Sequence, residues 1–194
     1  MRTSNLERNT NETKINLTLN IDGSGTSNIN TGIGFLDHML ILFSKHSSMD
    51  LEVIAAGDLY VDNHHTVEDV GILLGQAIRA SLGDRVSIKR YGSAFTPMDE
   101  ALTLCSLDLS NRPFLVFDYE FKTQRLGEFE VETLKEFLYG LVYNSGMCLH
   151  VNVMSGANTH HIIESIFKGF ARALKEACII DPNIKGVLST KGSL

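Results

Sequence analysis

A five-residue pattern occurs twice in this chain, and every position of the second copy is displaced from the first by the same interval. Residues 64–68 read His-His-Thr-Val-Glu, and residues 160–164 read His-His-Ile-Ile-Glu. Both copies open segments with helical periodicity. Repetition of three metal-binding side chains at one spacing indicates a duplicated unit and favours a metal protein. The repeat therefore restricts the fold to two similar halves.

The expected secondary structure follows a comparable order in both halves. In the first half, residue patterns predict strands at 13–21, 26–30 and 51–55, a turn at 22–25 after which the chain returns, and helices at 34–43 and 64–82. In the second half they predict strands at 91–97, 101–109, 113–121 and 148–154 and helices at 128–145 and 160–177. We expect an α+β fold with an internal duplication, in which residues 1–88 and 89–194 each form a small mixed sheet covered by two helices.

The composition argues against several classes of protein. The net charge of -6 argues against a general binder of nucleic-acid backbones. The polar start lacks the apolar stretch of a signal peptide, and no apolar run approaches the roughly 20 residues that span a bilayer. Three cysteines, far apart in apolar sequence, predict reduced thiols. We expect a cytoplasmic protein without a nucleic-acid or membrane partner.

Helix geometry predicts how each copy of the pattern would bind metal. The first histidine and the glutamate are four residues apart and share one helix face, so they can bind the same ion. The second histidine points about 100° away and would serve a different ion. We hypothesise that each ion takes the first histidine and glutamate of one copy and the second histidine of the other. The six expected ligands are His64, His65, Glu68, His160, His161 and Glu164.

Two further histidines are candidate ligands. His38 follows Asp37, which could orient a neighbouring imidazole, although a local hydrogen bond would explain His38 equally well. His150 lies in an apolar strand pattern, where a satisfied core histidine is the commoner case. If each joins one site, both ions have three histidines and one glutamate and keep open positions for substrate. Such ligands suit Mn, Fe, Co or Zn.

Six segments spread over essentially the whole chain resemble motifs of the imidazoleglycerol-phosphate dehydratase family. They are Arg8-x-Thr10-x-Glu12-Thr13, Thr31-Gly-Ile-Gly-Phe-Leu-Asp-His-Met39, Asp62-Asn-His-His-Thr-Val-Glu-Asp69, Pro97-Met-Asp-Glu-Ala-Leu102, Asn158-Thr-His-His-Ile-Ile-Glu164 and Ser189-Thr-Lys-Gly192. The resemblance implies a ribosomal S5 domain 2-like fold. It also implies a hydro-lyase of histidine biosynthesis, which converts D-erythro-imidazole-glycerol phosphate into imidazole-acetol phosphate through a metal-bound imidazolate.

The resemblance further implies cofactors, partners and residue roles. Two Mn(II) ions per chain are expected, and the active sites are expected between subunits of a 24-mer built from trimers. Glu12 matches the family's proton-shuttle glutamate and forms the implied catalytic set with Glu68 and Glu164. The implied substrate- and phosphate-binding residues are Glu12, Arg90, Arg112, Lys168, Ser189 and Lys191. Without the resemblance, each cation would be a solvated surface residue.

Two departures from the family pattern stand close to these residues. Asp62-Asn63 stands where many relatives carry Asp-Asp, and this pair can still cap the helix that follows. Ile41 and Leu42 stand where relatives often carry Asp-Gln, so the polar group of that glutamine is missing.

Two other functions compete with a dehydratase. A metal storage or sensing protein also needs clustered histidine and glutamate, but it needs no phosphate-binding set such as Arg90, Arg112 and Lys191. A two-metal hydrolase of phosphate esters favours bridging carboxylates, and the share of carboxylates among the expected ligands is low. The sequence therefore favours the dehydratase.

Overall fold

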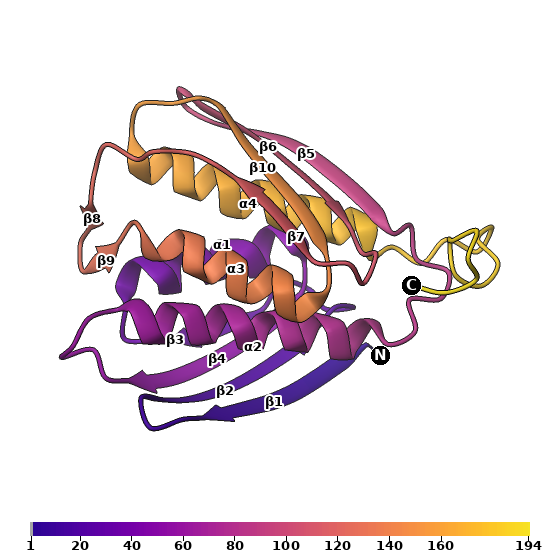
Figure 1. Cartoon of the computed structure of the whole chain (residues 1–194), viewed down its shortest axis with the longest axis horizontal. Coiled ribbons are helices and arrows are strands. Elements are labelled where there is room, and N and C mark those ends of the chain that lie inside the picture. The colour runs from indigo at the N-terminus through magenta and orange to yellow at the C-terminus, as the bar shows by residue number, and fades with distance from the viewer. Residues whose placement is uncertain (1) are drawn as a thin grey trace.

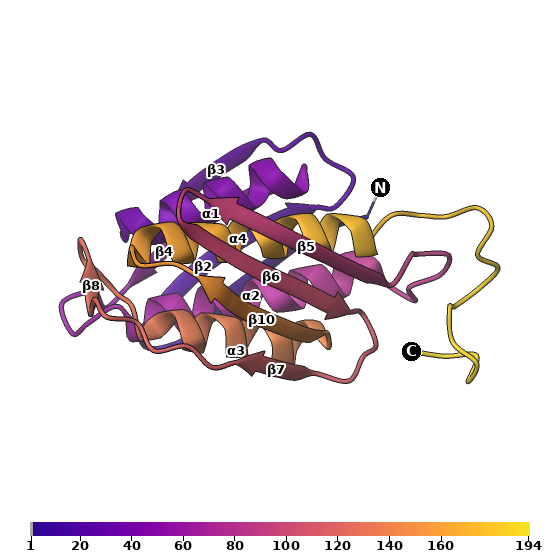
Figure 2. The same ribbon diagram turned by 90° about the horizontal axis from the view of Figure 1, so that it is seen from above.

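Two four-stranded sheets form the outer layers of the molecule, and four helices lie between them (Figures 1 and 2). The computed structural model describes residues 2–194. The first half contains β1 (Thr3–Asn9), β2 (Thr13–Asn20), β3 (Ser27–Asn30), α1 (Gly34–Ser47), β4 (Asp50–Gly57) and α2 (His64–Leu82). The second half contains β5 (Tyr91–Met98), β6 (Ala101–Asp108), β7 (Phe114–Phe117), β8 (Arg125–Leu126), β9 (Phe129–Glu130), α3 (Thr133–Ser145), β10 (Cys148–Ser155) and α4 (Thr159–Ala177).

The two sheets have the same topology, which confirms the predicted duplicated α+β fold. Their strand orders are β1-β2-β4-β3 and β5-β6-β10-β7. In each sheet the first three strands are antiparallel, and the last strand is parallel to its neighbour. The helices correspond in the same way, so α2 and α4, which carry the repeated pattern, occupy equivalent places. Among residues 2–194, no helix is both long and apolar enough to cross a membrane.

The pairing in the first sheet differs from the expected one. The strand predicted at 26–30 does not return beside the strand that it follows, because β3 pairs in parallel with β4. The two edges of β2 are occupied by β4 and by β1, a strand that was not predicted. The outward side chains of β1 are polar and only Ser4 on its inner face is buried, so β1 lacks the apolar alternation that identifies a strand.

In the second half, two predicted boundaries are wrong. The strand expected to reach residue 121 ends at Phe117, and the helix expected from residue 128 begins at Thr133. Between them, β8 and β9 form a small hairpin. Gly127, with φ of 60°, lies in its two-residue turn, a position that favours glycine. The sequence pattern does not distinguish Phe129 of this hairpin from an apolar residue in the first turn of a helix.

Aromatic contacts and close helix packing hold the two halves together. The rings of Phe43 on α1 and Phe170 on α4 stack with centroids 5.6 Å apart. Helices α2 and α3 approach so closely that a Cβ atom at Gly71 would lie 2.4 Å from the carbonyl oxygen of Phe137. Such packing is rigid, because an added methyl group there would force two backbones apart. Each of the two contacts joins a helix of the first half to a helix of the second half, α1 to α4 and α2 to α3.

Both histidine motifs lie at one end of the helix layer, and the C-terminal residues lie at the other end (Figures 1 and 2). Contacts near the motifs agree with this arrangement. The side chain of Asn63 donates a hydrogen bond to the carbonyl of Glu128, and the ring of Phe35 contacts those of Phe129 and His160. The fold therefore gathers the expected metal ligands at the end of the molecule that also holds the β8–β9 hairpin.

Candidate metal centre and anion pocket

Equivalent residues cap the two helices that carry the histidines. The carboxylate of Asp62 accepts a hydrogen bond from the backbone N–H of His64 at 2.8 Å. In the second copy, the side chain of Asn158 accepts from the backbone N–H of His160 at 2.9 Å. Both caps stand two residues before the first histidine, as the duplication requires. The Asp62-Asn63 pair thus caps α2 through Asp62, while the side chain of Asn63 makes no cap hydrogen bond.

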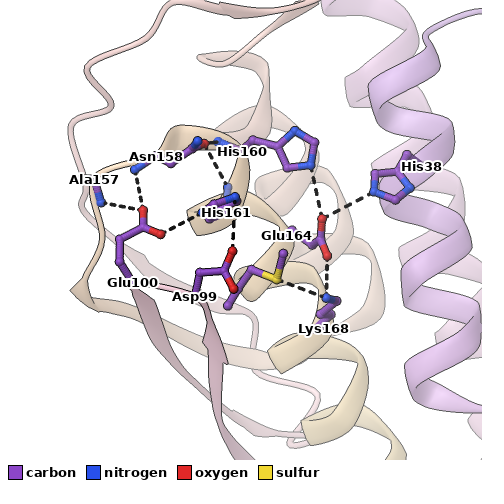
Figure 3. Close-up of polar contacts among 10 residues, drawn as sticks. His38, Asp99, Glu100, Ala157, Asn158, His160, His161, Glu164 and Lys168 are labelled. Atoms are coloured by element: carbon purple, nitrogen blue, oxygen red, sulfur yellow. Dashed lines mark hydrogen bonds and ion pairs between the residues drawn. The ribbon is translucent and has the colours of Figure 1, made fainter.

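Three side chains of the second copy and of α1 form a group that could bind a metal ion (Figure 3). One carboxylate oxygen of Glu164 lies 3.2 Å from Nε2 of His160 and 3.5 Å from Nε2 of His38. The three ligand atoms all lie within 4.8 Å of one another. Within residues 2–194 this is the single group of three or more such side chains. His38 thus contacts an expected ligand of the second copy.

Neighbouring side chains lower the pKa of the Glu164 carboxyl group. Its side chain is almost fully buried, and burial alone would raise the pKa of the carboxyl group. The ammonium group of Lys168, 2.5 Å from Oε1, and the ring of His38 outweigh burial and keep the pKa of Glu164 below its usual value. The other oxygen, Oε2, faces the two histidines. A carboxylate with a lowered pKa beside two imidazoles is a suitable donor set for a divalent transition metal.

The possible role of Asp37 as a partner of an imidazole is corrected by the structure. Its Oδ1 accepts hydrogen bonds from the backbone N–H and the hydroxyl of Thr31, at 2.8 Å and 2.6 Å. Asp37 therefore stabilises the loop before α1 and helps to fix where that helix begins.

The first copy of the pattern is more open than the second. Nε2 of His64 lies 3.9 Å from a carboxylate oxygen of Glu68, and both side chains are almost half exposed. No third ligand from the described part of the same chain joins them. Within one chain, His161 does not join His64 and Glu68. The hypothesised exchange of second histidines between the two copies of the pattern is therefore not formed inside a single chain. His64 and Glu68 therefore form an incomplete site that faces solvent.

Each second histidine contacts a carboxylate that the sequence reasoning missed. Nδ1 of His65 lies 3.0 Å and 3.2 Å from the two oxygens of Asp58, and this contact raises the pKa of His65. Nδ1 of His161 lies 2.8 Å from Oε2 of Glu100 (Figure 3). The contact raises the pKa of His161 and is the largest of the effects that lower the pKa of Glu100 to about 2.

The opposite nitrogen of each second histidine also faces a carboxylate, but at a longer distance. Nε2 of His65 lies 3.8 Å from Oε1 of Glu12, and Nε2 of His161 lies 3.8 Å from Asp99. These separations exceed a hydrogen bond and leave both Nε2 atoms available. The Asp-Glu pair at 99–100, between two strand patterns, was the one signal in the sequence that could have indicated this pairing.

Hydrogen bonds and an ion pair, centred on Asp69 of α2, fix the turn that carries Glu12. The hydroxyl oxygen of Thr10 accepts the backbone N–H of Glu12 at 3.1 Å. The hydroxyl of Thr13 donates to the buried carboxylate of Asp69, which also pairs with Arg8 at 2.8 Å. The turn is fixed while the carboxylate of Glu12 remains half exposed. The carboxylate of Glu12 is thus accessible at the surface of the chain.

Apart from Glu12, five residues are expected to bind the substrate's phosphate, and four of them line one pocket of about 850 Å³ between the start of β5 and the C-terminal residues. They are Arg90, Arg112, Ser189 and Lys191. The guanidinium group of Arg90 is fixed by Asp108 at 2.7 Å and 3.0 Å, which raises the pKa of Arg90. The pocket lining holds four cationic side chains, the fourth being that of Lys185, and no acidic one, so the pocket suits an anion. Lys168, the fifth residue, lies instead beside Glu164.

The anion pocket and the candidate metal centre lie at opposite ends of α4. The backbone N–H of Arg90 donates to the carbonyl of Ala177, the last residue of the helix, whereas His160 and Glu164 lie in its first two turns. A helix of 19 residues is about 28 Å long, at about 1.5 Å per residue. His150 is separate from both sites, because it is exposed on the outer face of the second sheet.

The fold and the two sites define a duplicated α+β protein with a candidate metal centre and a separate anion pocket. The family model described as "IGPD: Imidazoleglycerol-phosphate dehydratase" matches residues 31–174. The imidazoleglycerol-phosphate dehydratase of Acetivibrio thermocellus is 59% identical over 189 residues, which cover 97% of each chain. That of Streptococcus mutans serotype c is 57% identical over the full length of both chains. The chain belongs to the imidazoleglycerol-phosphate dehydratase family.

Solved structures agree with this assignment. The crystal structure of the dehydratase from Staphylococcus aureus subsp. aureus N315 has a TM-score of 0.84 at 38% identity, and the match covers 92% of this chain and 99% of that one. The enzyme from Pyrococcus furiosus, solved in complex with (S)-C348, has a TM-score of 0.83 at 38% identity, with 97% and 100% covered. The protein is therefore a hydro-lyase of histidine biosynthesis, and the storage and hydrolase alternatives are wrong.

Proposed function

We propose that this hydro-lyase acts on imidazole-glycerol phosphate with two Mn(II) ions per chain, at sites that a second copy of the chain completes. The observation that carries the proposal is the separation of the two sites along α4. The substrate is far shorter than a helix of 19 residues. Its imidazole ring therefore cannot lie at the histidines while its phosphate lies in the anion pocket of the same chain. A neighbouring copy must supply one of the two.

The donor set fits a divalent transition metal. His38, His160 and Glu164 present two imidazole nitrogens and an ionised carboxylate oxygen to a common point. His64 and Glu68 offer a second pair that needs ligands from elsewhere. We assign the remaining ligands, His65, His161 and His150, to contacts between copies. A Mn(II) ion on a nitrogen of the substrate's ring would lower the pKa of the ring N–H and strengthen the push of the ring on the leaving hydroxyl.

The chain's own residues perform the remaining tasks. The carboxylate of Glu12 takes the proton from the carbon beside the imidazole ring, because its half-exposed side chain stands 3.8 Å from Nε2 of a proposed ligand, His65. Arg90, Arg112, Ser189 and Lys191 bind the phosphate and fix the substrate's orientation. Lys168 would contact the phosphate only where a neighbouring copy brings that group to Glu164.

The outer face of the second sheet supports association between copies. The large apolar side chains Phe95, Phe114 and Met154 are each more than half exposed there. His150 lies on the same face, paired in register with Val116 on β7. Exposed apolar surface of this kind indicates an interface, and a copy seated there would bring its own residues to His150. We propose the 24-mer built from trimers as the assembly.

The test measures the metal content and the turnover of protein that was purified without any chelator. We expect about two Mn(II) ions per chain, loss of activity when the metal is stripped, and recovery when Mn(II) is returned. Turnover that persists in metal-free protein would contradict the proposal. So would recovery by buffer exchange without added metal.

A further inference from the structure

The two second histidines share an arrangement that the duplication does not explain. Nδ1 of His65 contacts Asp58, in the loop before α2, and Nδ1 of His161 contacts Glu100, in the turn between β5 and β6. Asp58 directly follows β4, and the residue that directly follows β10 is Gly156, which carries no carboxylate. The two halves therefore place a carboxylate beside Nδ1 from unrelated positions. This indicates that each histidine ring needs a carboxylate partner at Nδ1.

The contact determines which ring nitrogen is free. An ionised carboxylate has no proton to donate, so the Nδ1 atom beside it must carry the hydrogen. In the neutral ring, Nε2 then keeps its lone pair. For both histidines, the nearest carboxylate oxygen to Nε2 is 3.8 Å away, so no hydrogen bond occupies that lone pair. Nε2 is thus the free nitrogen in both rings.

We propose that Asp58 and Glu100 are positioning residues for metal binding, and that each holds its histidine in the tautomer whose Nε2 can ligate an ion. The inference rests on the proposed two-metal site and adds to it two residues that do not touch the metal. A carboxylate behind a ligating imidazole raises the basicity of the ligand and fixes the ring plane. Removal of such a partner costs about 10–100-fold in metal affinity.

Glu100 offers a sharp test, because its two oxygens have separate partners. Oε1 accepts the backbone N–H groups of Ala157 and Asn158, and Oε2 contacts His161 (Figure 3). In Glu100→Gln, the amide oxygen retains the two backbone donors. The amide NH2 then faces Nδ1 and donates to it, which moves the proton of the ring to Nε2. The loop stays anchored while the tautomer is reversed.

The experiment is a double-mutant cycle on the affinity of the assembled protein for Mn(II), measured by equilibrium dialysis. We expect Glu100→Gln to raise the dissociation constant about 10–100-fold without lowering the melting temperature of the metal-free protein. In a His161→Ala background, the same change should have almost no further effect, because its target is absent. Glu52→Gln, on an exposed carboxylate of β4 that contacts no histidine, is the matched control.

Additive losses in the cycle, or wild-type affinity in Glu100→Gln, would overturn the inference. Asp58→Ala with His65→Ala repeats the test in the first half, so a variant that fails to fold does not leave the question open. The outcome is separable from that for the proposed function. If the wild-type protein takes up no Mn(II), the two-metal site itself fails. If it does and both cycles are additive, only the positioning role fails.

Discussion

Glu12→Gln is expected to reduce kcat by about 10²–10⁴-fold, the usual contribution of a general base, while the protein keeps its full metal content. The amide has the same shape as the carboxylate but cannot take a proton from carbon. The backbone N–H of Glu12 and the hydroxyl of Thr13 hold the turn, and neither changes. The loss should therefore appear in turnover and leave the fold intact.

The measurement is steady-state turnover together with metal analysis of the same sample. Glu7→Gln, on an exposed outward position of β1, is a matched control and should behave as the wild-type protein. Near-normal turnover in Glu12→Gln would remove Glu12 from the chemistry. A loss of metal would instead make it a ligand, since its carboxylate lies near Nε2 of His65.

Glu164→Gln should remove one of the two ions and reduce turnover by at least about 10³-fold, because several kcal/mol of charge stabilisation are lost with the metal. The carboxylate of Glu164 is the common contact of His38 and His160. A neutral amide is a weak donor to a divalent transition metal, although its oxygen can still accept a hydrogen bond from Lys168.

Metal content per chain and the size of the assembly in solution check this prediction. We expect about one ion per chain and a smaller or less stable oligomer, since the proposed sites lie between copies. A Glu164→Gln protein that retains two ions and the wild-type assembly would contradict the assignment of Glu164 as a ligand.

The repeated pattern predicted the duplicated fold well, because periodicity and spacing are local properties of the sequence. The helices that start at His64 and Thr159 were placed within one residue. Strand β1 and the β8–β9 hairpin were missed, because their short or polar patterns carry little periodicity. The partner of β3 could not be predicted, because strand order depends on packing between distant segments.

The candidate site was predictable in its ligand types and less so in its geometry. The repeat indicated His160 and Glu164, and the structure brings His38 to them from another helix. The roles of Asp58 and Glu100 could not be read from the sequence, because each acts through a contact between a loop and a helix. The phosphate-binding residues could be predicted only from the family resemblance, because isolated surface cations form no recognisable sequence pattern.

Activity in mixed assemblies tests the central claim, a site completed by a second copy. One chain would carry Glu12→Gln, which is expected to keep its metal, and the other would carry Arg112→Ala with Lys191→Ala. If Glu12 and the phosphate ligands of one site come from different chains, a random equal mixture should recover about a quarter of wild-type activity. Each variant alone should be almost inactive. Mixed assemblies that remain as inactive as either parent would contradict the account, because the site would then lie within a single chain.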